Sequence, residues 1–168
     1  MTNFQRIGGI SNAVTGRNFE NTSKIYLENL LSRTLVLGKK VEIGISKTKK
    51  LHKFDLGDEE TIIECKTHRW TTGDYVPSAK LTVWNEAMYY FSLAPKSFIK
   101  IFIIEKHISE KRNNTLGLYY IKIFGHLIPD DVEIWEFDVI NNCHDVIKRK
   151  TQPDITDLQS VSAKDLKS

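Results

Sequence analysis

Residues 53–68 read KFDLGDEETIIECKTH, and this stretch decides the predicted fold. Two short apolar runs, KFDL and TIIECK, flank a segment that begins at Gly57 and continues with acidic residues. Glycine and aspartate favour tight turns, so the two runs are predicted to pair as an antiparallel hairpin. The first run carries Asp55, and the second carries Glu64 and Lys66.

Strand geometry predicts that these three side chains share one face of the sheet. Side chains alternate along a strand, so Glu64 and Lys66 point to the same side. Directly opposite residues of an antiparallel pair also share a face, and a two-residue loop at 59–60 would place Asp55 opposite Glu64. A four-residue loop keeps this parity, whereas an odd-length loop or a bulge breaks it.

Two carboxylates and a lysine on otherwise apolar strands are costly to bury without compensation. A divalent metal between Asp55 and Glu64 would supply it, because hard oxygen ligands suit Mg²⁺ or Mn²⁺. Lys66 would then position or deprotonate a water, or neutralise charge on a phosphate. The alternative is a solvated sheet face on which the three groups form an ordinary cross-strand ion pair.

The rest of the chain predicts a single α/β domain over residues 1–147. The expected order is helix, three strands, helix, strand and two further strands. The segments are an irregular polar arm over 1–15, a helix from Arg17 with Thr15 as N-cap, a strand around 41–45, the two runs described above, a helix over 78–94, and strands at 98–104, 118–124 and 132–140. Residues 148–168 are polar and are predicted to form a tail, or at most a short helix docked from outside.

Glu20 lies at the flank of the first helix's apolar stripe, one turn before Lys24. Two interpretations are open: a surface ion pair with Lys24, or a carboxylate that reaches over the core edge toward Asp55.

Composition narrows the function classes. Two cysteines with no metal-ligand spacing predict neither a disulfide framework nor a zinc site. No apolar run has the roughly 20 residues of a membrane helix, and the first residues lack the features of a signal peptide, so a cytoplasmic location is expected. A net charge of +3 permits a nucleic-acid partner without demanding one.

These residues resemble the PD-(D/E)XK nuclease superfamily, the fold of many type II restriction endonucleases and Holliday-junction resolvases. The resemblance implies an αβββαβ core at about 16–104, with a central mixed sheet flanked by helices and extra C-terminal strands. Asp55 matches the first motif acid, Glu64-Cys65-Lys66 matches the acid-x-lysine element, and Glu20 matches an extra acid on the first helix. Phe54 stands where the motif has proline. Asp58 is the competing acid, but it falls in the turn.

The resemblance implies Mg²⁺-dependent hydrolysis of DNA phosphodiesters, with Mn²⁺ able to substitute, by a homodimeric restriction enzyme that cuts duplex DNA at a specific sequence. Asp55 and Glu64 would hold the metal together with the backbone carbonyl of Cys65, and Lys66 would orient the attacking water. Two alternatives stay open. One is a structure-specific nuclease of the resolvase or repair type, and the other is a non-catalytic nucleic-acid-binding or protein-binding domain on the same fold.

Several residues around the motif are candidates for DNA contact. The basic connection before the first run is the best source of phosphate contacts, although such lysines are as often simply solvated. Arg69, Trp70 and Tyr75 follow the second run in the sequence and could contact the bases or the backbone of DNA. His68 shares the face of Lys66 and could support the site from there, but a surface position is expected. The region after Pro129 is acidic and should face away from DNA or toward a partner subunit. The predicted DNA-binding residues are Lys47, Lys49, Lys50, Lys53, Arg69, Tyr75 and Lys80. The basic connection consists of the first four of these lysines together with His52.

Overall fold

Six strands form one mixed sheet in the computed structural model of the chain, which describes residues 4–151. Three helices, one turn of 3-10 helix and a two-stranded ribbon complete the regular structure of that part. In chain order the elements are α1 (Phe4–Leu31), β1 (Val36–Ile43), β2 (Lys50–Gly57), β3 (Thr61–Lys66), α2 (Ser78–Leu93), β4 (Ile99–Glu105), β5 (Ile108–Ser109), β6 (Asn114–Thr115), α3 (Leu116–Phe124), the 3-10 turn η1 (Gly125–Leu127), β7 (Val132–Asp138) and β8 (Cys143–Lys148).

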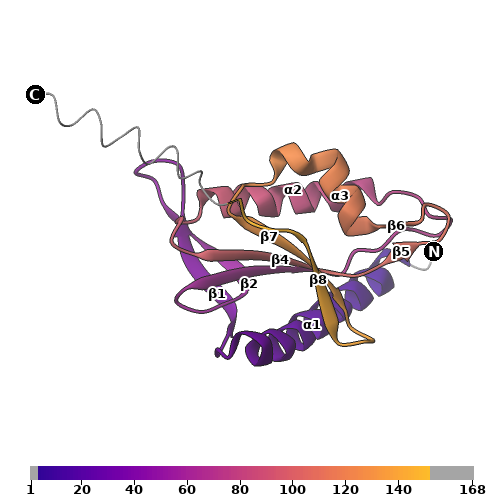
Figure 1. Ribbon diagram of the computed structural model, residues 1–168, viewed down its shortest axis with the longest axis horizontal. Helices are drawn as coiled ribbons and strands as arrows, with labels where there is room; N and C mark the ends of the chain where they lie inside the picture. The colour runs from indigo at the N-terminus through magenta and orange to yellow at the C-terminus, as the bar shows by residue number, and fades with distance from the viewer. Residues whose placement is uncertain (1–3, 152–168) are drawn as a thin grey trace, which may run out of the picture.

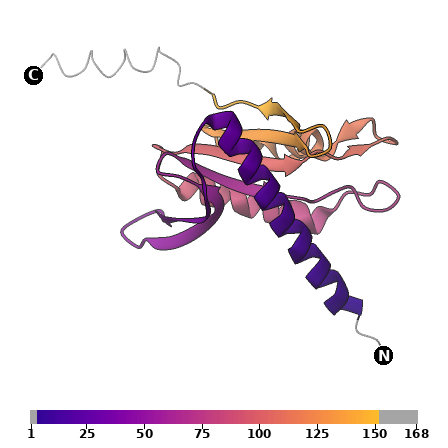
Figure 2. The same cartoon turned by 90° about the horizontal axis from the view of Figure 1, so that it is seen from below.

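The strand order across the sheet is β1-β2-β3-β4-β7-β8. The first three strands form an antiparallel meander, β3, β4 and β7 run parallel, and β8 returns antiparallel to β7. Parallel neighbours need a crossover connection, which α2 supplies between β3 and β4, and α3 lies in the connection from β4 to β7. Helices α2 and α3 cover one face of the sheet, and α1 crosses the opposite face (Figures 1 and 2).

The central strands are buried on both faces. Along β4, Phe102 and Ile104 enter the core beneath α2 and α3, whereas Ile101 and Ile103 enter the core beneath α1. A strand covered on both sides has no solvated face, so its sequence is apolar at nearly every position. This is why residues 98–104 are apolar apart from Lys100, and the strand predicted there is confirmed.

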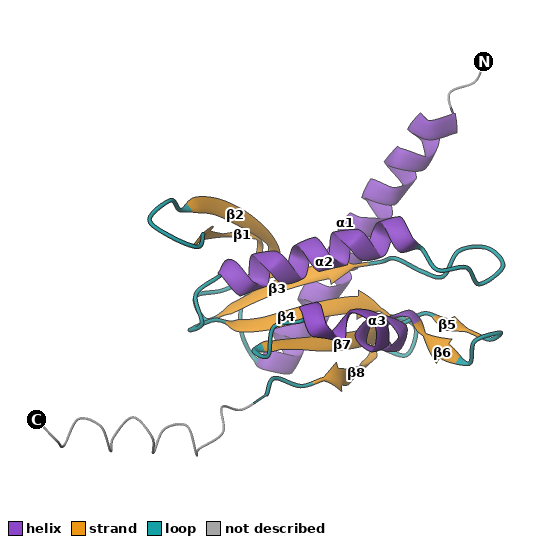
Figure 3. Cartoon of the chain, turned by 90° about the horizontal axis from the view of Figure 1, so that it is seen from above, coloured by secondary structure: helices purple, strands orange, loops and turns teal. Residues whose placement is uncertain are grey.

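The β1–β2 hairpin is longer than its contact with β3. The β1–β2 ladder runs from Val36↔Gly57 to Ile43↔Lys50, but the β2–β3 ladder contains only Leu56↔Ile63 and Gly57↔Ile62. The hairpin therefore separates from β3 beyond Leu56 and projects from the body of the domain (Figure 3). Helix α1 packs against both β2 and β3 near this separation.

The α/β class and much of the element order agree with the prediction from sequence. Helix α2 lies within the predicted range 78–94, and its buried residues recur at three- and four-residue spacings along one face: Leu81, Trp84, Ala87, Met88 and Phe91. The order helix, three strands, helix, strand is present, and β7 accounts for the run at 132–140. Strand β1 begins at Val36 and ends at Ile43, so Ile45 lies beyond it.

Three sequence-based assignments are wrong. Helix α1 begins at Phe4, so residues 4–15 are not an irregular arm and Thr15 is not an N-cap. The run at 118–124 belongs to helix α3, whose N-cap is Thr115, with the hydroxyl oxygen accepting a hydrogen bond from the Leu118 N–H at 3.2 Å. Strand β8 was not expected, and it extends into the predicted tail at Lys148. Residues 152–168 of that tail lie outside the described residues.

Within residues 4–151, no helix has both the length and the hydropathy needed to cross a bilayer.

Candidate functional site

The β2–β3 hairpin brings Asp55, Glu64 and Lys66 together. A two-residue loop at 59–60 joins the strands, because the Asp58 N–H donates to the Thr61 carbonyl at 2.9 Å. The register Leu56↔Ile63 would next pair Asp55 with Glu64, but the ladder stops there. Instead, the N–H of Cys65 donates to Asp55 Oδ2 at 2.8 Å. The Asp55 carboxylate thus occupies the opening between the separating strands.

The Lys66 ammonium lies between the two carboxylates. Its Nζ is 2.6 Å from Glu64 Oε2 and 3.4 Å from Asp55 Oδ2. Burial alone would lower the pKa of Lys66, but the charges of Glu64 and Asp55 outweigh burial and raise it. Lys66 is therefore a cation at neutral pH, and it cannot accept a proton from water there.

The pKa values of the two carboxyl groups shift in opposite directions. Burial, and then the charge of Glu64, raise the pKa of Asp55 to about 6. Burial also acts to raise the pKa of Glu64, but the adjacent His52 and the charge of Lys66 lower it overall. His52 Nε2 lies 3.6 Å from Glu64 Oε1, which is too far for a hydrogen bond. Glu64 is thus the more firmly ionised acid of the pair.

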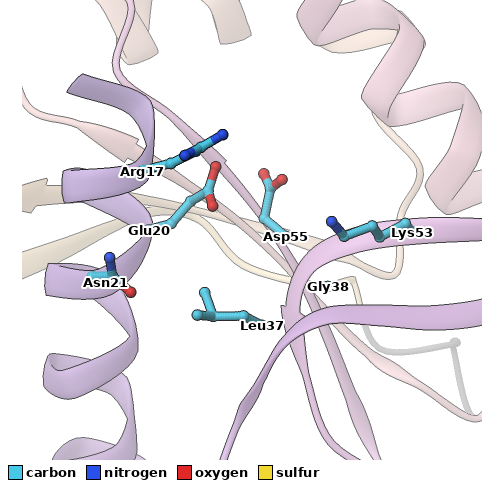
Figure 4. A pocket seen from close by; sticks show the side chains of 7 residues that line it. All are labelled: Arg17, Glu20, Asn21, Leu37, Gly38, Lys53 and Asp55. Carbon is cyan, nitrogen blue, oxygen red and sulfur yellow. The ribbon is translucent and has the colours of Figure 1, made fainter. Parts of the chain in front are cut away.

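Helix α1 adds a third carboxyl group. Glu20 and Asp55 both line a cavity of about 430 Å³ between α1 and the β1–β2 hairpin, and their carboxylates point toward one another (Figure 4). Burial raises the pKa of Glu20, while the charges of Lys66 and Lys53 oppose that rise. Of the two interpretations of Glu20, the structure favours the one directed at Asp55, since Lys24 pairs instead with Glu28 at 2.6 Å.

The cavity contains residues that the sequence did not single out as site residues. Arg17 and Asn21 lie on the same side of α1 as Glu20, and Leu37 and Gly38 come from β1. The spacing of Arg17, Glu20 and Asn21 by three and four residues could have indicated the shared helix face. The approach of Leu37 and Gly38 depends on how the hairpin bends, and no local pattern predicts it.

The predicted DNA-binding lysines fall into two groups. Lys47, Lys49 and Lys50 lie at the exposed tip of the β1–β2 hairpin, where Lys49 Nζ donates to the Gly44 carbonyl at 2.6 Å. Lys53 lies further along β2 and lines the cavity beside Asp55 (Figure 4). Of these four lysines, only Lys53 lines the cavity together with Glu20 and Asp55.

The predicted contacts after β3 lie outside the cavity lining. Arg69 forms an ion pair with Glu105, Tyr75 is 68% exposed, and Lys80 is exposed in the first turn of α2. Trp70 is buried beneath the Arg112 guanidinium, 5.0 Å from the ring centroid, so contact of its ring with bases is not expected in this arrangement.

His68 is not the surface residue that was expected. Its Nδ1 accepts a hydrogen bond from the indole N–H of Trp84 at 2.7 Å. Burial, followed by the charges of Lys80 and Lys66, lowers the pKa of His68 to about 4. His68 is therefore neutral at pH 7 and anchors the end of β3 to α2.

The acidic region after Pro129 does not form an exposed edge. Strand β7 lies inside the sheet, between β4 and β8. Glu136 is buried and accepts the Gly117 N–H at 3.1 Å, and Asp131 pairs with Lys100 at 2.7 Å. Glu136 and Asp131 are thus engaged within the fold, whereas Asp130 is exposed.

The carboxylates have the chemistry of a Mg²⁺ site. Mg²⁺ is commonly held by one or two carboxylates, with water and substrate phosphate as its other ligands, which fits Asp55 and Glu64. The Lys66 ammonium between them already occupies the place of a cation. Among the described residues, no group of three or more His, Cys, Asp or Glu side chains is arranged to hold a metal by itself. The predicted third ligand, the Cys65 carbonyl, belongs to the residue whose N–H binds Asp55.

Comparisons with models of known protein families, with curated proteins and with solved structures found no significant match.

Proposed function

We propose that this chain is a Mg²⁺-dependent DNA endonuclease with a restriction-endonuclease-like αβββαβ core. The observation that carries the proposal is the convergence of Asp55, Glu64 and Lys66 where β2 and β3 separate, with Glu20 facing Asp55 from α1. Burying carboxylates and a lysine costs desolvation free energy that their mutual attraction often does not recover, so stability is a weak reason for such a cluster. Asp55 lines an open cavity together with Glu20, and this placement supports a catalytic role.

Each residue has a role in the proposed reaction. Asp55 and Glu64 would hold Mg²⁺, which supplies Lewis-acid activation of the phosphate and of a bound water. Hydrolysis forms a bond between phosphorus and the water oxygen and breaks the bond between phosphorus and one deoxyribose oxygen. The water gives up a proton to solvent, the departing sugar oxygen takes up a proton to become a hydroxyl, and negative charge builds on the phosphate oxygens in the transition state. Lys66, as a cation, stabilises that charge and orients the water rather than deprotonating it. Glu20, which faces Asp55 in the cavity, would add a third carboxylate to the site.

A plasmid assay tests this function. Supercoiled plasmid is incubated with the wild-type chain or with Glu64→Gln, in Mg²⁺ or in EDTA. Wild type with Mg²⁺ should nick or linearise the plasmid, and the other three combinations should leave it intact. Absence of cleavage by the wild type across many DNA sequences, or equal cleavage by Glu64→Gln, would contradict the proposal.

The pattern of cleavage separates the two kinds of nuclease. A restriction enzyme gives fixed fragment ends when a phage genome is digested, whereas a structure-specific enzyme cuts branched DNA without a fixed sequence. We propose the restriction type, which implies a homodimer because two sites are needed to cut both strands of a duplex symmetrically. Light scattering should then give about twice the chain mass of 19.4 kDa. A mass of one chain under cleavage conditions would favour the structure-specific type.

One observation favours a non-catalytic domain as a second candidate. Glu64 and Lys66 already form a close ion pair at 2.6 Å, as expected if the carboxylates served only the fold. Calorimetry with Mn²⁺ distinguishes the candidates, because a catalytic site should bind the metal and lose that binding in Asp55→Asn and Glu64→Gln. DNA binding without any metal binding would instead support the non-catalytic domain.

A further inference from the structure

Two cationic side chains enter the cavity from opposite walls. Arg17 extends from α1 on one side, and Lys53 extends from β2 on the other (Figure 4). Both are exposed to solvent. Lys66 is occupied by Glu64 and Asp55, but in the part of the chain that the structure describes no ion pair or hydrogen bond engages the side chain of Arg17 or Lys53. Their charges are therefore accessible to a ligand.

The backbone leaves space for Lys53 at this position. Gly38 has a φ of +68°, and a Cβ atom added there would lie 2.3 Å from Lys53 Cε. Any other residue at Gly38 would push the Lys53 stem aside and strain the backbone. Lys53 therefore crosses over Gly38, which has no side chain, and its ammonium reaches the cavity beside Asp55.

The charges around the cavity select the kind of anion that could bind. Glu20 and Asp55 repel a simple anion placed among them, while Arg17 and Lys53 attract negative oxygens at the cavity's walls. A ligand that satisfies both must be an extended polyanion, with one phosphate near the cations and the next facing the metal-binding acids. A nucleic-acid backbone has this repeating chemistry.

We propose that Arg17 and Lys53 bind an internal backbone phosphate of duplex DNA, next to the phosphodiester that is cleaved. This inference rests on the proposed nuclease function and adds a substrate-positioning pair to it. The pair fixes the register of the strand relative to Asp55 and Glu64, and it does not take part in bond cleavage.

Binding measured without cleavage tests the pair. A fluorescent duplex with 5′-hydroxyl ends, which offers only internal phosphates, is titrated in EDTA at several NaCl concentrations and followed by anisotropy. The test variants are Arg17→Gln and Lys53→Gln. The matched controls are Lys122→Gln on α3 and Arg149→Gln, which remove the same charges at other exposed positions. Circular dichroism melting of all four variants checks that the fold is kept.

Each test variant should bind duplex DNA roughly threefold or more weakly, and the slope of log affinity against log salt should decrease by about 0.9. The control variants should bind like the wild type. The inference is overturned if the test variants keep the wild-type affinity and slope, or if the controls lose as much. If the wild type cleaves DNA while Arg17→Gln and Lys53→Gln bind DNA like the wild type, only this inference fails. If the wild type neither binds nor cleaves DNA, the proposed function fails with it.

Discussion

Asp55 and Glu64 are neighbouring acids whose pKa values move in opposite directions. The pKa of Asp55 is raised to about 6, first by burial and then by the charge of Glu64. The pKa of Glu64 is lowered by His52 and Lys66 in spite of burial. A site that binds a divalent cation must release the Asp55 proton, so metal binding should weaken as the pH falls through 6.

The same pKa shift predicts a pH-dependent effect of Asp55→Asn on stability. Between about pH 4 and 6, the native state binds a proton at Asp55 that the unfolded chain has already released, so this group makes stability fall as pH rises. The side chain of Asp55→Asn does not titrate, so the variant does not lose this part of its stability as the pH rises. Urea unfolding should show the variant's free energy of unfolding, minus that of the wild type, increasing from pH 4 to 7 by on the order of 1–2 kcal/mol. A difference that stays constant or shrinks would show that Asp55 is not buried as described.

His52 should position Glu64. Its ring stacks on Tyr90 with centroids 4.0 Å apart, and its buried Nε2 has no hydrogen-bond partner among the described residues although Glu64 Oε1 is 3.6 Å away. When a metal displaces Lys66, a small shift of Glu64 would complete that hydrogen bond. His52→Phe keeps the ring stacking and removes the N–H group. Mn²⁺ affinity by calorimetry should fall about 10-fold, with the melting temperature nearly unchanged. An unchanged affinity would remove His52 from the site.

At the scale of elements, Asp58 stabilises the loop of the β2–β3 hairpin, whereas Asp55 bridges its two strands beyond that loop. Asp58 Oδ1 accepts the N–H groups of Glu60 and Thr61 at 2.8 and 2.7 Å, so it stabilises the two-residue loop. Asp58→Ala should lower the free energy of unfolding by about 1–2 kcal/mol and leave Mn²⁺ affinity unchanged at temperatures where the variant is folded. At pH 7, Asp55→Asn should lose Mn²⁺ binding without lowering the free energy of unfolding. A loss of metal binding in Asp58→Ala alone would mean that the motif acid had been misidentified.

The predicted elements succeeded where one local signal dominated. Helix α2 has a clear apolar face and ends before Pro95, and the acidic turn between β2 and β3 fixed their pairing. A strand was wrongly predicted in place of helix α3, because LGLYYIKIF is apolar, aromatic and short. Such a run fits a buried strand as well as a helix. Thr115 at its N-cap was the signal that could have decided it. Strand β8 is partly exposed and polar, so its pairing with β7 has no local signature.

At the scale of the whole molecule, the site is assembled from elements that are distant in sequence. Strand pairing could predict that Asp55, Glu64 and Lys66 lie close together, because all three lie in one hairpin. The position of Glu20 could be offered only as one of two interpretations, since it depends on the docking of α1 across the sheet. Arg17 and Gly38 depend on both that docking and the bend of the β1–β2 hairpin. Tertiary geometry of this kind leaves no trace in local periodicity.

The most direct measurement of the central claim is the single-turnover rate at which Lys66→Met cleaves duplex DNA in Mg²⁺, compared with Lys122→Met. Both variants lose one lysine charge and keep a side chain of similar length, and both are assayed below their melting temperatures. The account predicts that Lys66→Met is slower than wild type by about 100-fold or more, whereas Lys122→Met cleaves at the wild-type rate. Equal rates for Lys66→Met and the wild type would contradict the assignment of Asp55, Glu64 and Lys66 as a nuclease active site.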